Sequence, residues 1–292
     1  MKGIIIINPF EKENHQATRL KEEFEKKGVS VEIIANGWSL ATLETDRIEF
    51  DCKGVNFAVF LDKNKYLSEM LEKANVRVFN NHRAIRTCDD KGETCIALSG
   101  RGIKMPRTIF APLCYSQDAE ILVEDAKFIV SELGLPIIVK ESYGSLGKGI
   151  YKADTELELL ELMKKLKLKP HLYQQYLGKK IGVDVRVIVI GGKTICAMKR
   201  TNKNDFRSNL SCGGSGEKIQ LSSEFKKVAE KTAKILGLDY CGVDLLYGDD
   251  DSPYVCEVNS NAFFKGVEKV TGENVAEKYA QYIIEKIKNH LA

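Results

Sequence analysis

Three oxygen-bearing side chains lie in two short apolar runs near the end of the sequence. Asp244 lies in the run 242–246 (GVDLL), and Glu257 and Asn259 lie in the run 255–259 (VCEVN). Residues i and i+2 of a strand share a face, so Glu257 and Asn259 are expected to point the same way, and a hairpin partner would bring Asp244 opposite them. Two carboxylates and one amide oxygen suit Mg²⁺, which usually completes its octahedron with waters and substrate phosphates. The alternative is an edge hairpin with its polar face in water, but the apolar neighbours favour a buried hairpin, where an unpaired carboxylate is costly.

A second candidate is a glycine-rich loop in the middle of the chain. Lys140 ends an apolar run and opens into this loop, whose small residues include Gly144, Ser145, Gly147 and Gly149. Successive backbone N–H groups of such a loop can bind phosphate oxygens, and the lysine adds a point charge for the same anion. The spacing matches neither a Walker A loop nor G-x-G-x-x-G. For an isolated loop, a flexible hairpin turn between two strands is the favoured interpretation.

A third candidate is the polar stretch 199–216, in which basic side chains precede a glycine-rich tail. Arg200 or Arg207 could stabilise charge on a transferring phosphoryl group, and Asn209 could orient that group or reach a metal ion. On its own, this stretch is better explained as a solvated basic loop.

The composition restricts the functions that are open to the chain. It has 292 residues with a net charge of +3, which is too small and too dispersed for a nucleic-acid-binding footprint. Its eight cysteines form no C-x-x-C pair, which argues against zinc ribbons and favours reduced thiols in a cytosol. No apolar stretch approaches the length that a membrane span needs. We therefore expect a cytoplasmic protein with neither a nucleic-acid nor a membrane partner.

The predicted elements indicate an α/β chain whose C-terminal part is α+β. Strands and one helix alternate in the first third and predict a small parallel sheet up to about residue 85. Later strands joined by Gly191-Gly192 predict an antiparallel sheet. The predicted strands are 4–7, 29–35, 55–61, 76–79, 136–140, 172–177, 184–190, 194–200, 240–247 and 254–258. The predicted helices are 16–27, 89–100, 119–133, 156–166, 224–236 and 274–291.

Together and in this order, the motifs resemble the ATP-grasp superfamily and, within it, the RimK-type amino-acid ligases (alpha-L-glutamate ligase-like). The resemblance runs from Asp89 to the C-terminus. Its most specific parts are the segments 184–187 (DVRV), 206–210 (FRSNL), 242–246 (GVDLL) and 257–259 (EVN).

The resemblance implies three domains, with ATP clamped between the last two. These are an N-terminal, Rossmann-like pre-ATP-grasp domain (1–88), a central domain with the glycine-rich lid (89–176) and a C-terminal domain with the metal site (177–292). The residues implied to bind the nucleotide are Lys91, Lys140, Gly144, Ser145, Gly147, Gly149, Gln175, Tyr176, Leu177 and Asp184. Those implied to hold one or two Mg²⁺ ions, with Mn²⁺ as a substitute, are Asp244, Glu257 and Asn259.

The resemblance also implies a reaction. A substrate carboxylate would attack the γ-phosphorus of ATP, with Arg200, Arg207 and Asn209 at the reacting groups, and an amine would then displace phosphate from the acyl phosphate. The expected partners are a carboxylate substrate and an amine acceptor, which would be an amino acid, a peptide or a carrier protein. Relatives commonly form dimers or tetramers, so a homo-oligomer is one of the states that the resemblance allows, and the sequence itself leaves the oligomeric state open.

Two other functions remain open from the sequence. The same scaffold could serve a phosphotransferase, in which a hydroxyl takes the phosphoryl group. A non-catalytic nucleotide-binding regulator ranks lower, because the candidate metal ligands and Arg207 are all retained. Two departures from the family pattern are also visible. Gln175 replaces a frequent glutamate, and Ser260-Asn261-Ala262 follows Asn259 where glutamate-adding relatives usually have a Pro-Gly segment.

Overall fold

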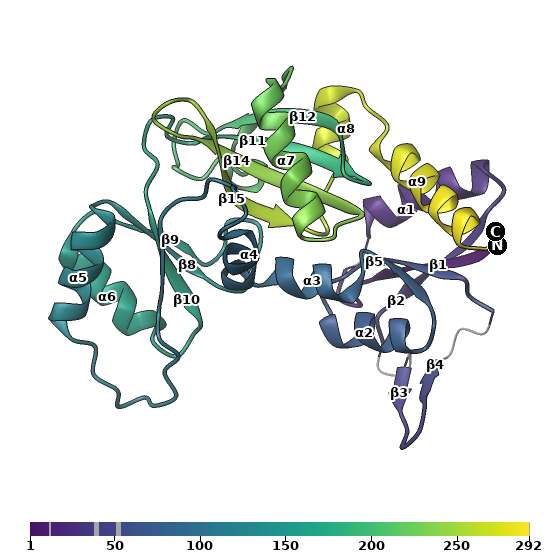
Figure 1. The fold of residues 1–292 in the computed structure, drawn as a ribbon, viewed down its shortest axis with the longest axis horizontal. Helices are drawn as coiled ribbons and strands as arrows, with labels where there is room; N and C mark the ends of the chain where they lie inside the picture. Colours follow the sequence, from purple (N-terminus) through teal and green to yellow (C-terminus); the bar gives the residue numbers. More distant parts are fainter. Residues whose placement is uncertain (12, 38–40, 51–53, 292) are drawn as a thin grey trace.

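The computed structural model describes residues 1–292 except for 12, 38–40, 51–53 and 292. Figure 1 shows three sheets that follow one another along the chain, with both termini at one end of the molecule. A two-stranded hairpin, β3 (Ala41–Leu43) with β4 (Ile48–Phe50), projects beside the first sheet.

The first sheet is parallel and has the strand order β2-β1-β5-β6, which confirms the predicted parallel sheet. Ile4, Ile5 and Ile6 of β1 are buried, as expected for a parallel strand covered on both faces. α1 packs on one face through Leu20 and Phe24, and α2 packs on the other through Leu67 and Leu71. The elements are β1 (Lys2–Ile7), α1 (His15–Lys26), β2 (Ser30–Ala35), β5 (Phe57–Leu61), α2 (Lys65–Lys73) and β6 (Arg77–Phe79).

The central sheet is antiparallel and has the strand order β7-β10-β8-β9. Two helices pack on it, and their buried side chains, such as Ile129 and Leu159, form one core with Val139 and Tyr173 of the sheet. The elements are β7 (Thr108–Phe110), α5 (Val123–Leu133), β8 (Ile137–Glu141), β9 (Ile150–Ala153), α6 (Glu156–Leu166) and β10 (His171–Gln175).

The third sheet is antiparallel and has the strand order β13-β12-β11-β14-β15. The predicted hairpin at Gly191-Gly192 joins its strands β11 and β12. α7 covers one face, and α8 with α9 covers the other. The elements are β11 (Val183–Ile190), β12 (Lys193–Thr201), the 3₁₀ turn η1 (Leu210–Cys212), β13 (Ser215–Lys218), α7 (Ser223–Ile235), β14 (Tyr240–Tyr247), β15 (Pro253–Asn259), α8 (Lys265–Thr271) and α9 (Val275–Leu291).

Two short helices connect the first sheet to the central one. They are α3 (His82–Asp89) and α4 (Lys91–Leu98), and they run beside the third sheet in Figure 1. Ala84, Leu98 and Ile103 belong to the same hydrophobic core as α7 and the third sheet. Each sheet lies within one of the three expected domains, but the segment from Ala84 to Ile103 packs on the third sheet. The proposed boundaries stay a prediction.

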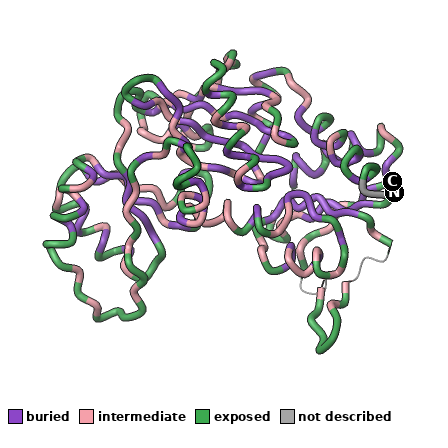
Figure 2. Tube along the Cα trace, viewed as in Figure 1, coloured by how far each residue is buried: buried purple, intermediate pink, exposed green. Residues whose placement is uncertain are grey.

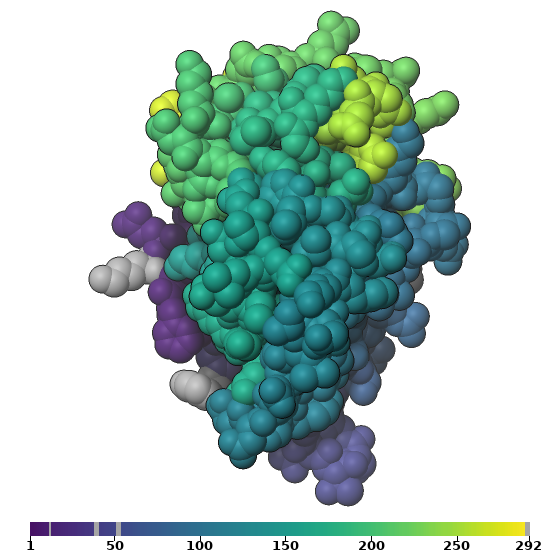
Figure 3. Space-filling model, turned by 90° about the vertical axis from the view of Figure 1, so that its left-hand side faces the viewer, coloured from purple at the N-terminus to yellow at the C-terminus, as the bar shows by residue number. Residues whose placement is uncertain are grey.

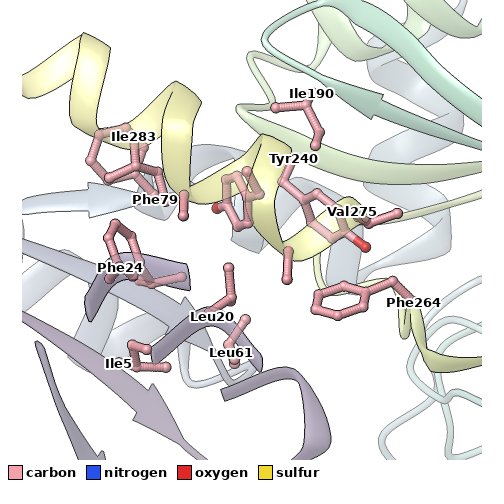
Figure 4. Packing of buried hydrophobic residues seen from close by; sticks show 14 of the residues in the cluster. Ile5, Leu20, Phe24, Leu61, Phe79, Ile190, Tyr240, Phe264, Val275 and Ile283 are labelled. Carbon is pink, nitrogen blue, oxygen red and sulfur yellow. The ribbon is translucent and has the colours of Figure 1, made fainter. Parts of the chain in front are cut away.

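One hydrophobic core joins the first and third sheets. Figure 4 shows Phe24 of α1, Tyr240 of β14 and Ile283 of α9 in this core. Asn80 reinforces the contact, because its Nδ2 donates to the carbonyl oxygens of Tyr240 at 2.8 Å and Ser260 at 2.7 Å. In Figure 2, buried residues (purple) lie in both sheets. The two units are therefore packed together.

The sequence prediction missed several elements: β3, β4, α2, α3, β7, β9, β13 and α8. Most are short, and three of them (β7, β9 and β13) are edge strands that gain hydrogen bonds only by pairing with a longer neighbour. The cysteines in the described part are free, and Cys52 lies outside the described residues. Across the described ranges, no helix combines the length and the apolarity that crossing a membrane requires.

Candidate functional site

A cleft lies between the central and third sheets. Figure 3 looks onto this side of the molecule, where the central segment (teal) adjoins the C-terminal segment (green). Apolar side chains such as Ile138, Ile150 and Leu246 line part of the cleft, and charged ones line the rest. The predicted site residues that line it are Lys91, Lys140, Gln175, Tyr176, Leu177, Asp184, Arg200, Arg207, Asn209, Asp244 and Glu257.

Two lysines bring positive charge into the cleft. Lys91 begins α4, whose N-cap Asp90 accepts hydrogen bonds from the N–H groups of Gly92 and Glu93. Lys140 lies on β8 and is only 6% exposed. Burial lowers the pKa of Lys91, and the nearby Lys140 lowers it further, whereas Glu257 opposes the shift. An anion bound between the two ammonium groups would relieve their repulsion.

The three candidate metal ligands lie on neighbouring strands, as the sequence predicted. In the antiparallel ladder of β14 and β15, Asp244 pairs with Glu257 and Gly242 pairs with Asn259. Directly opposed residues of a ladder project to the same face, so the two carboxylates share a face with the amide two residues on. A register shift follows Asp244 in this ladder, and the acid pair lies where the pairing changes.

Asp244 is 2% exposed and forms ion pairs with two arginines. Arg186 donates to it through Nε at 2.7 Å and Nη2 at 2.6 Å, and Arg200 Nη2 lies 2.9 Å from the same carboxylate. Burial pushes the pKa of Asp244 up, but the two guanidinium groups outweigh burial and hold it below its usual value. Arg200 also pairs with Asp184, through Nε at 2.7 Å. Acidic and basic side chains therefore alternate through this network, in the order Asp184, Arg200, Asp244 and Arg186.

The glycine-rich loop is a hairpin between β8 and β9 and is held by the polar stretch that follows β12. Arg207 Nη1 donates to the carbonyl oxygen of Gly147 at 3.0 Å, and Lys91 Nζ donates to that of Gly144 at 3.0 Å. Gly147 has a φ of +78°, which side-chain-bearing residues rarely adopt. Arg207 also pairs with Asp205 at 2.6 Å, which raises the pKa of Arg207. The loop therefore has the predicted hairpin backbone, and its hydrogen bonds with Lys91 and Arg207 also connect it to residues that line the cleft.

The segment after β10 forms the connection between the central and third sheets. The pairing of β10 with β8 ends at Gln175, whose N–H donates to the carbonyl oxygen of Arg107 at 2.9 Å. Tyr176 and Leu177 continue along the cleft. The preceding Gln174 is buried, its Nε2 donates to Thr108 Oγ1 at 3.0 Å, and its Oε1 has no hydrogen-bond partner.

A second recess adjoins the cleft, and several parts of the chain line it. The glycine-rich loop contributes Ser145, and the loops after β1 and β5 contribute polar groups such as Asn8 and Asp62. The other polar lining residues are Arg186, Asn209, Glu257, Asn259 and Asn261. Glu257 and Asn209 line both cavities. Of the predicted site residues, Gly144, Gly147 and Gly149 line neither cavity and lie in the hairpin loop above.

The donor set at the acid pair fits Mg²⁺. Across the described ranges, no group of three or more His, Cys, Asp or Glu side chains could hold a metal ion, so a site here needs the amide of Asn259 and oxygens from a ligand. The Nδ2 atom of Asn259 is buried without a hydrogen-bond partner, and Glu257 has no ion pair among the described residues. A carboxylate without a cation, such as Glu257, is a group that a hard cation would satisfy, whereas the unpartnered Nδ2 donor of Asn259 needs an acceptor, such as a phosphate oxygen of a ligand.

Sequence reasoning missed several residues of the site. Arg186 was visible only as part of a motif, and its pairing with Asp244 depends on β11 lying beside β14. Gln174 carried no distinct signal, because its strand also holds the polar residues His171 and Gln175. The recess residues from the first sheet carried none, because they follow their strands as ordinary loop residues.

Comparison with known proteins identifies the family. The model of the RimK-like ATP-grasp domain matches residues 88–283. The probable alpha-L-glutamate ligase of Psychromonas ingrahamii is 30% identical over 300 residues, which cover 97% of this chain and 96% of that protein. The human N-acetylaspartylglutamate synthase A is 33% identical over 75% of this chain, but the matched part covers only 55% of the human protein, so the chain spans about half of its length.

Solved structures agree in fold. A structure of the ATP-grasp ligase PsnB, complexed with a phosphomimetic variant of minimal precursor, Mg and ADP, superposes with a TM-score of 0.69 over 97% of both chains at 20% identity. That likeness concerns the fold alone. The extent of the family match and the identity to the Psychromonas protein decide the assignment, and the chain belongs to the RimK-like ATP-grasp family.

Proposed function

We propose that this protein is an ATP- and Mg²⁺-dependent carboxylate–amine ligase that adds an amino acid to a peptide, a protein or a small molecule. The family supports this proposal, because its named members include glutamate ligases. The observation that carries it is the arrangement of the two cavities, which meet at Glu257 and Asn209. A ligase needs a nucleotide and a second substrate side by side, and this junction offers a place for each.

In this proposal, the cleft binds ATP. The backbone from Gln175 to Leu177 and the apolar wall would hold adenine, while Lys91 and Lys140 would bind phosphate oxygens. Residues 144–149 would close over the triphosphate, since their carbonyl groups already contact Lys91 and Arg207. Asp184 would act indirectly, because its carboxylate holds Arg200 at the floor of the cleft.

Asp244, Glu257 and Asn259 would hold one or two Mg²⁺ ions, with Mn²⁺ as a substitute. The bound ion would neutralise charge on the triphosphate and orient its terminal phosphate. Arg186 and Arg200 already balance the charge of Asp244, so these two arginines would adjust when an ion binds.

The reaction follows from these positions. A substrate carboxylate oxygen attacks the γ-phosphorus, the bond to the β,γ-bridging oxygen breaks, and ADP leaves with its electron pair. The amine then attacks the acyl carbon, phosphate departs, and the amine loses a proton. Arg207 would stabilise charge on the transferring group and Asn209 would orient it, so that positioning and electrostatics supply most of the rate.

Release of ADP tests the proposal directly. The protein is incubated with MgATP and with pools of carboxylates, of amines, of both together and of hydroxyl compounds, and mass spectrometry searches for a condensed or a phosphorylated product. We expect sustained ADP release and a product heavier than either substrate only when both pools are present. ADP release with a hydroxyl compound and no amine would instead identify a phosphotransferase. Absence of any turnover with all pools would contradict both functions.

A further inference from the structure

The recess continues along the first sheet into two further depressions. Asn8, Asp62 and Lys63 line the recess and also a second depression, which extends past the loops that follow β1, β2 and β5. Tyr66 and Met70 of α2 line this depression and also a third one, which lies against the hairpin of β3 and β4 that Figure 1 shows next to α2. We call the second and third depressions together the trough. Because each depression shares residues with the next, a continuous path leads from the junction of the two cavities to the hairpin.

The trough begins where an open parallel sheet offers a binding surface. In the order β2-β1-β5-β6, the chain moves from β1 to β2 on one side and then returns to β5 on the other. The point where the order reverses lies between β1 and β5, and open parallel sheets bind ligands beyond the carboxyl ends of their strands at this point. Residues 8–10 follow β1 and residues 62–64 follow β5, and both stretches line the trough.

Exposed apolar side chains lie along the length of the trough. Phe10 is 85% exposed, Tyr66 is 72% exposed and Leu43 is 66% exposed. Phe10 lines the second depression, Leu43 lines the third, and Tyr66 lines both. Apolar side chains that are exposed singly are common, but a set of them along one groove is typical of a binding surface. Aromatic rings bury a large area when another chain lies across them.

The series of depressions favours an extended chain over a compact ligand. A small molecule fills one depression and leaves the others empty. An extended polypeptide advances about 3.3 Å per residue and can pass from one depression to the next, while its side chains alternate between the surface and solvent. A polypeptide segment of several residues is therefore the ligand that uses the whole trough.

The charges of the trough indicate what kind of segment fits. Each basic residue of the trough has an acidic partner, and the pairs are Lys63 with Asp89 at 2.8 Å, Lys73 with Glu69 at 3.3 Å, and Arg47 with Glu49. The acids Glu44, Asp46 and Asp62 also line the trough, and none of them has an ion pair within the described part of the chain. The trough therefore carries acids that no base compensates, which complement a basic segment.

Asp62 is the most enclosed of these acids. It is 7% exposed, and its carboxylate accepts from Asn36 Nδ2 at 2.5 Å, from Asn8 Nδ2 at 3.2 Å and from the backbone N–H of Lys63 at 2.7 Å. All three donors are neutral, so the charge of the carboxylate is left for a cation to compensate. The whole chain has a net charge of +3, so attraction of a basic segment to this surface comes from its local acids.

The ring of Tyr66 already lies near a cation. Lys65 Nζ is 5.7 Å from the centroid of the Tyr66 ring and 5.6 Å from that of the Tyr143 ring. Aromatic faces attract ammonium and guanidinium groups through the ring quadrupole, and a lysine or arginine of a ligand uses the same attraction. Tyr143 belongs to the loop between β8 and β9, so a chain bound at Tyr66 lies beside the glycine-rich loop.

We propose that the trough binds an extended, basic segment of a polypeptide acceptor. The lysine or arginine side chains of this segment pair with Glu44, Asp46 and Asp62, and its apolar side chains lie against Phe10 and Tyr66. This inference rests on the proposed ligase function, for which it restricts the acceptor to a polypeptide. The first-sheet unit then holds the acceptor while the reacting group reaches the junction of the two cavities.

Fluorescence anisotropy tests binding without any turnover. The probes are fluorescein-labelled dodecapeptides that repeat Gly-Lys-Leu-Arg, Gly-Glu-Leu-Asp or Gly-Gln-Leu-Asn, and each is titrated with the full-length protein in the absence of nucleotide. We expect the basic peptide to bind about tenfold more tightly than the acidic and the neutral peptide. Its binding should weaken as the salt concentration rises, because salt screens the exposed acids of the hairpin.

Two double variants separate the charges of the trough from its rings. Glu44→Gln with Asp46→Asn removes two carboxylates, and Phe10→Ser with Tyr66→Ser removes two rings. Each double variant should weaken binding of the basic peptide by about fivefold or more, because each removes one kind of partner for the segment. The matched controls change exposed residues of the central unit and should bind the peptide as the wild type does; they are Asp118→Asn with Glu161→Gln, and Tyr115→Ser with Leu157→Ser.

The melting temperature reports whether each variant is folded. The proposal is overturned if the basic peptide does not bind, if the acidic or the neutral peptide binds as tightly, or if either folded trough variant binds within twofold of the wild type. Binding of the basic peptide without any condensed product in the ADP assay would count against the proposed function alone. Condensation of small carboxylates and amines by a protein that binds none of the peptides would count against this inference alone.

Discussion

The carboxylate of Asp244 accepts two hydrogen bonds from Arg186, at 2.7 Å from Nε and at 2.6 Å from Nη2. Asp244 is a proposed metal ligand that lines the cleft between the central and third sheets, whereas Arg186 lines the adjoining recess. The pair therefore connects the two cavities, and any ion that binds Asp244 must compete with a bidentate arginine. Without such an ion, the arginines allow this acid to stay ionised although it is buried.

Removing the charge of Asp244 should destabilise the fold. Asp244→Asn leaves Arg186 and Arg200 facing an uncharged amide in a buried setting, and loss of one member of such a network costs on the order of 3 kcal/mol. We expect a clear fall in the urea concentration at the midpoint of unfolding, which far-UV circular dichroism measures. Asp249→Asn, which changes an exposed loop residue, is the control and should unfold as the wild type does. Equal midpoints for the two variants would show that the ion pairs contribute little.

Glu257→Gln should abolish turnover while the fold is retained. The change keeps the volume of the side chain but removes the charge at the junction of the two cavities, and this charge has no ion-pair partner in the described part of the chain. We expect ADP release to fall by about 100-fold or more, since this carboxylate would hold the Mg²⁺ that neutralises charge on the transferring phosphoryl group. Glu161→Gln, on the exposed side of α6, should leave ADP release unchanged. Normal activity in Glu257→Gln would overturn the metal assignment.

The local part of the site could be predicted from the sequence. The i and i+2 relation of Glu257 and Asn259 is a property of any strand, and the acidic turn before β15 made a hairpin with β14 the simplest pairing. The ladder confirms that Asp244 lies opposite Glu257. The pairing of Asp244 with Arg186 was not predictable in the same way, because β11 and β14 are separated by two strands and a helix, and their register follows from packing of the whole sheet.

The recess also could not be predicted from the sequence, for a related reason. Asn8, Asp62 and Asn261 are distant in the chain, and they meet only because one core unites α1, α9 and the third sheet. Each residue alone reads as an ordinary loop residue. The glycine-rich loop shows the opposite case, since its hairpin backbone followed from its glycines, and only the contact of Gly147 with Arg207 required the tertiary structure.

Arg207→Lys should weaken closure of the glycine-rich loop. Arg207 uses separate nitrogens for the carbonyl oxygen of Gly147 and for Asp205, and a lysine ammonium cannot reproduce this planar fork. We expect a several-fold rise in the KM for ATP and a fall in kcat of about 100-fold, because the charge near the transferring phosphoryl group would be misplaced. Steady-state ADP release measures both constants. Arg101→Lys, which changes an exposed arginine, is the matched control and should leave both constants unchanged. Unchanged constants in Arg207→Lys would show that the contacts of Arg207 with Gly147 and Asp205 are not needed for activity.

His171 should make stability depend on pH in one direction. It is buried in the central sheet, and its ring nitrogens lie 2.7 Å from the carbonyl oxygen of Lys169 and 2.7 Å from the Tyr173 hydroxyl. Burial lowers the pKa of His171 below 6.5, and the Lys169 carbonyl only partly opposes the shift. Below pH 6.5 the unfolded chain therefore binds a proton that the folded chain does not, so stability is full above pH 6.5 and decreases as the pH falls toward the folded-state pKa. We expect the melting temperature of the wild type to fall between pH 7.5 and 5.5 by more than that of His171→Asn. His15→Asn, which alters an exposed histidine, is the control, and its melting temperature should depend on pH as that of the wild type does. Parallel pH profiles for wild type and His171→Asn would mean that this imidazole accepts a proton as readily in the folded chain as in the unfolded one.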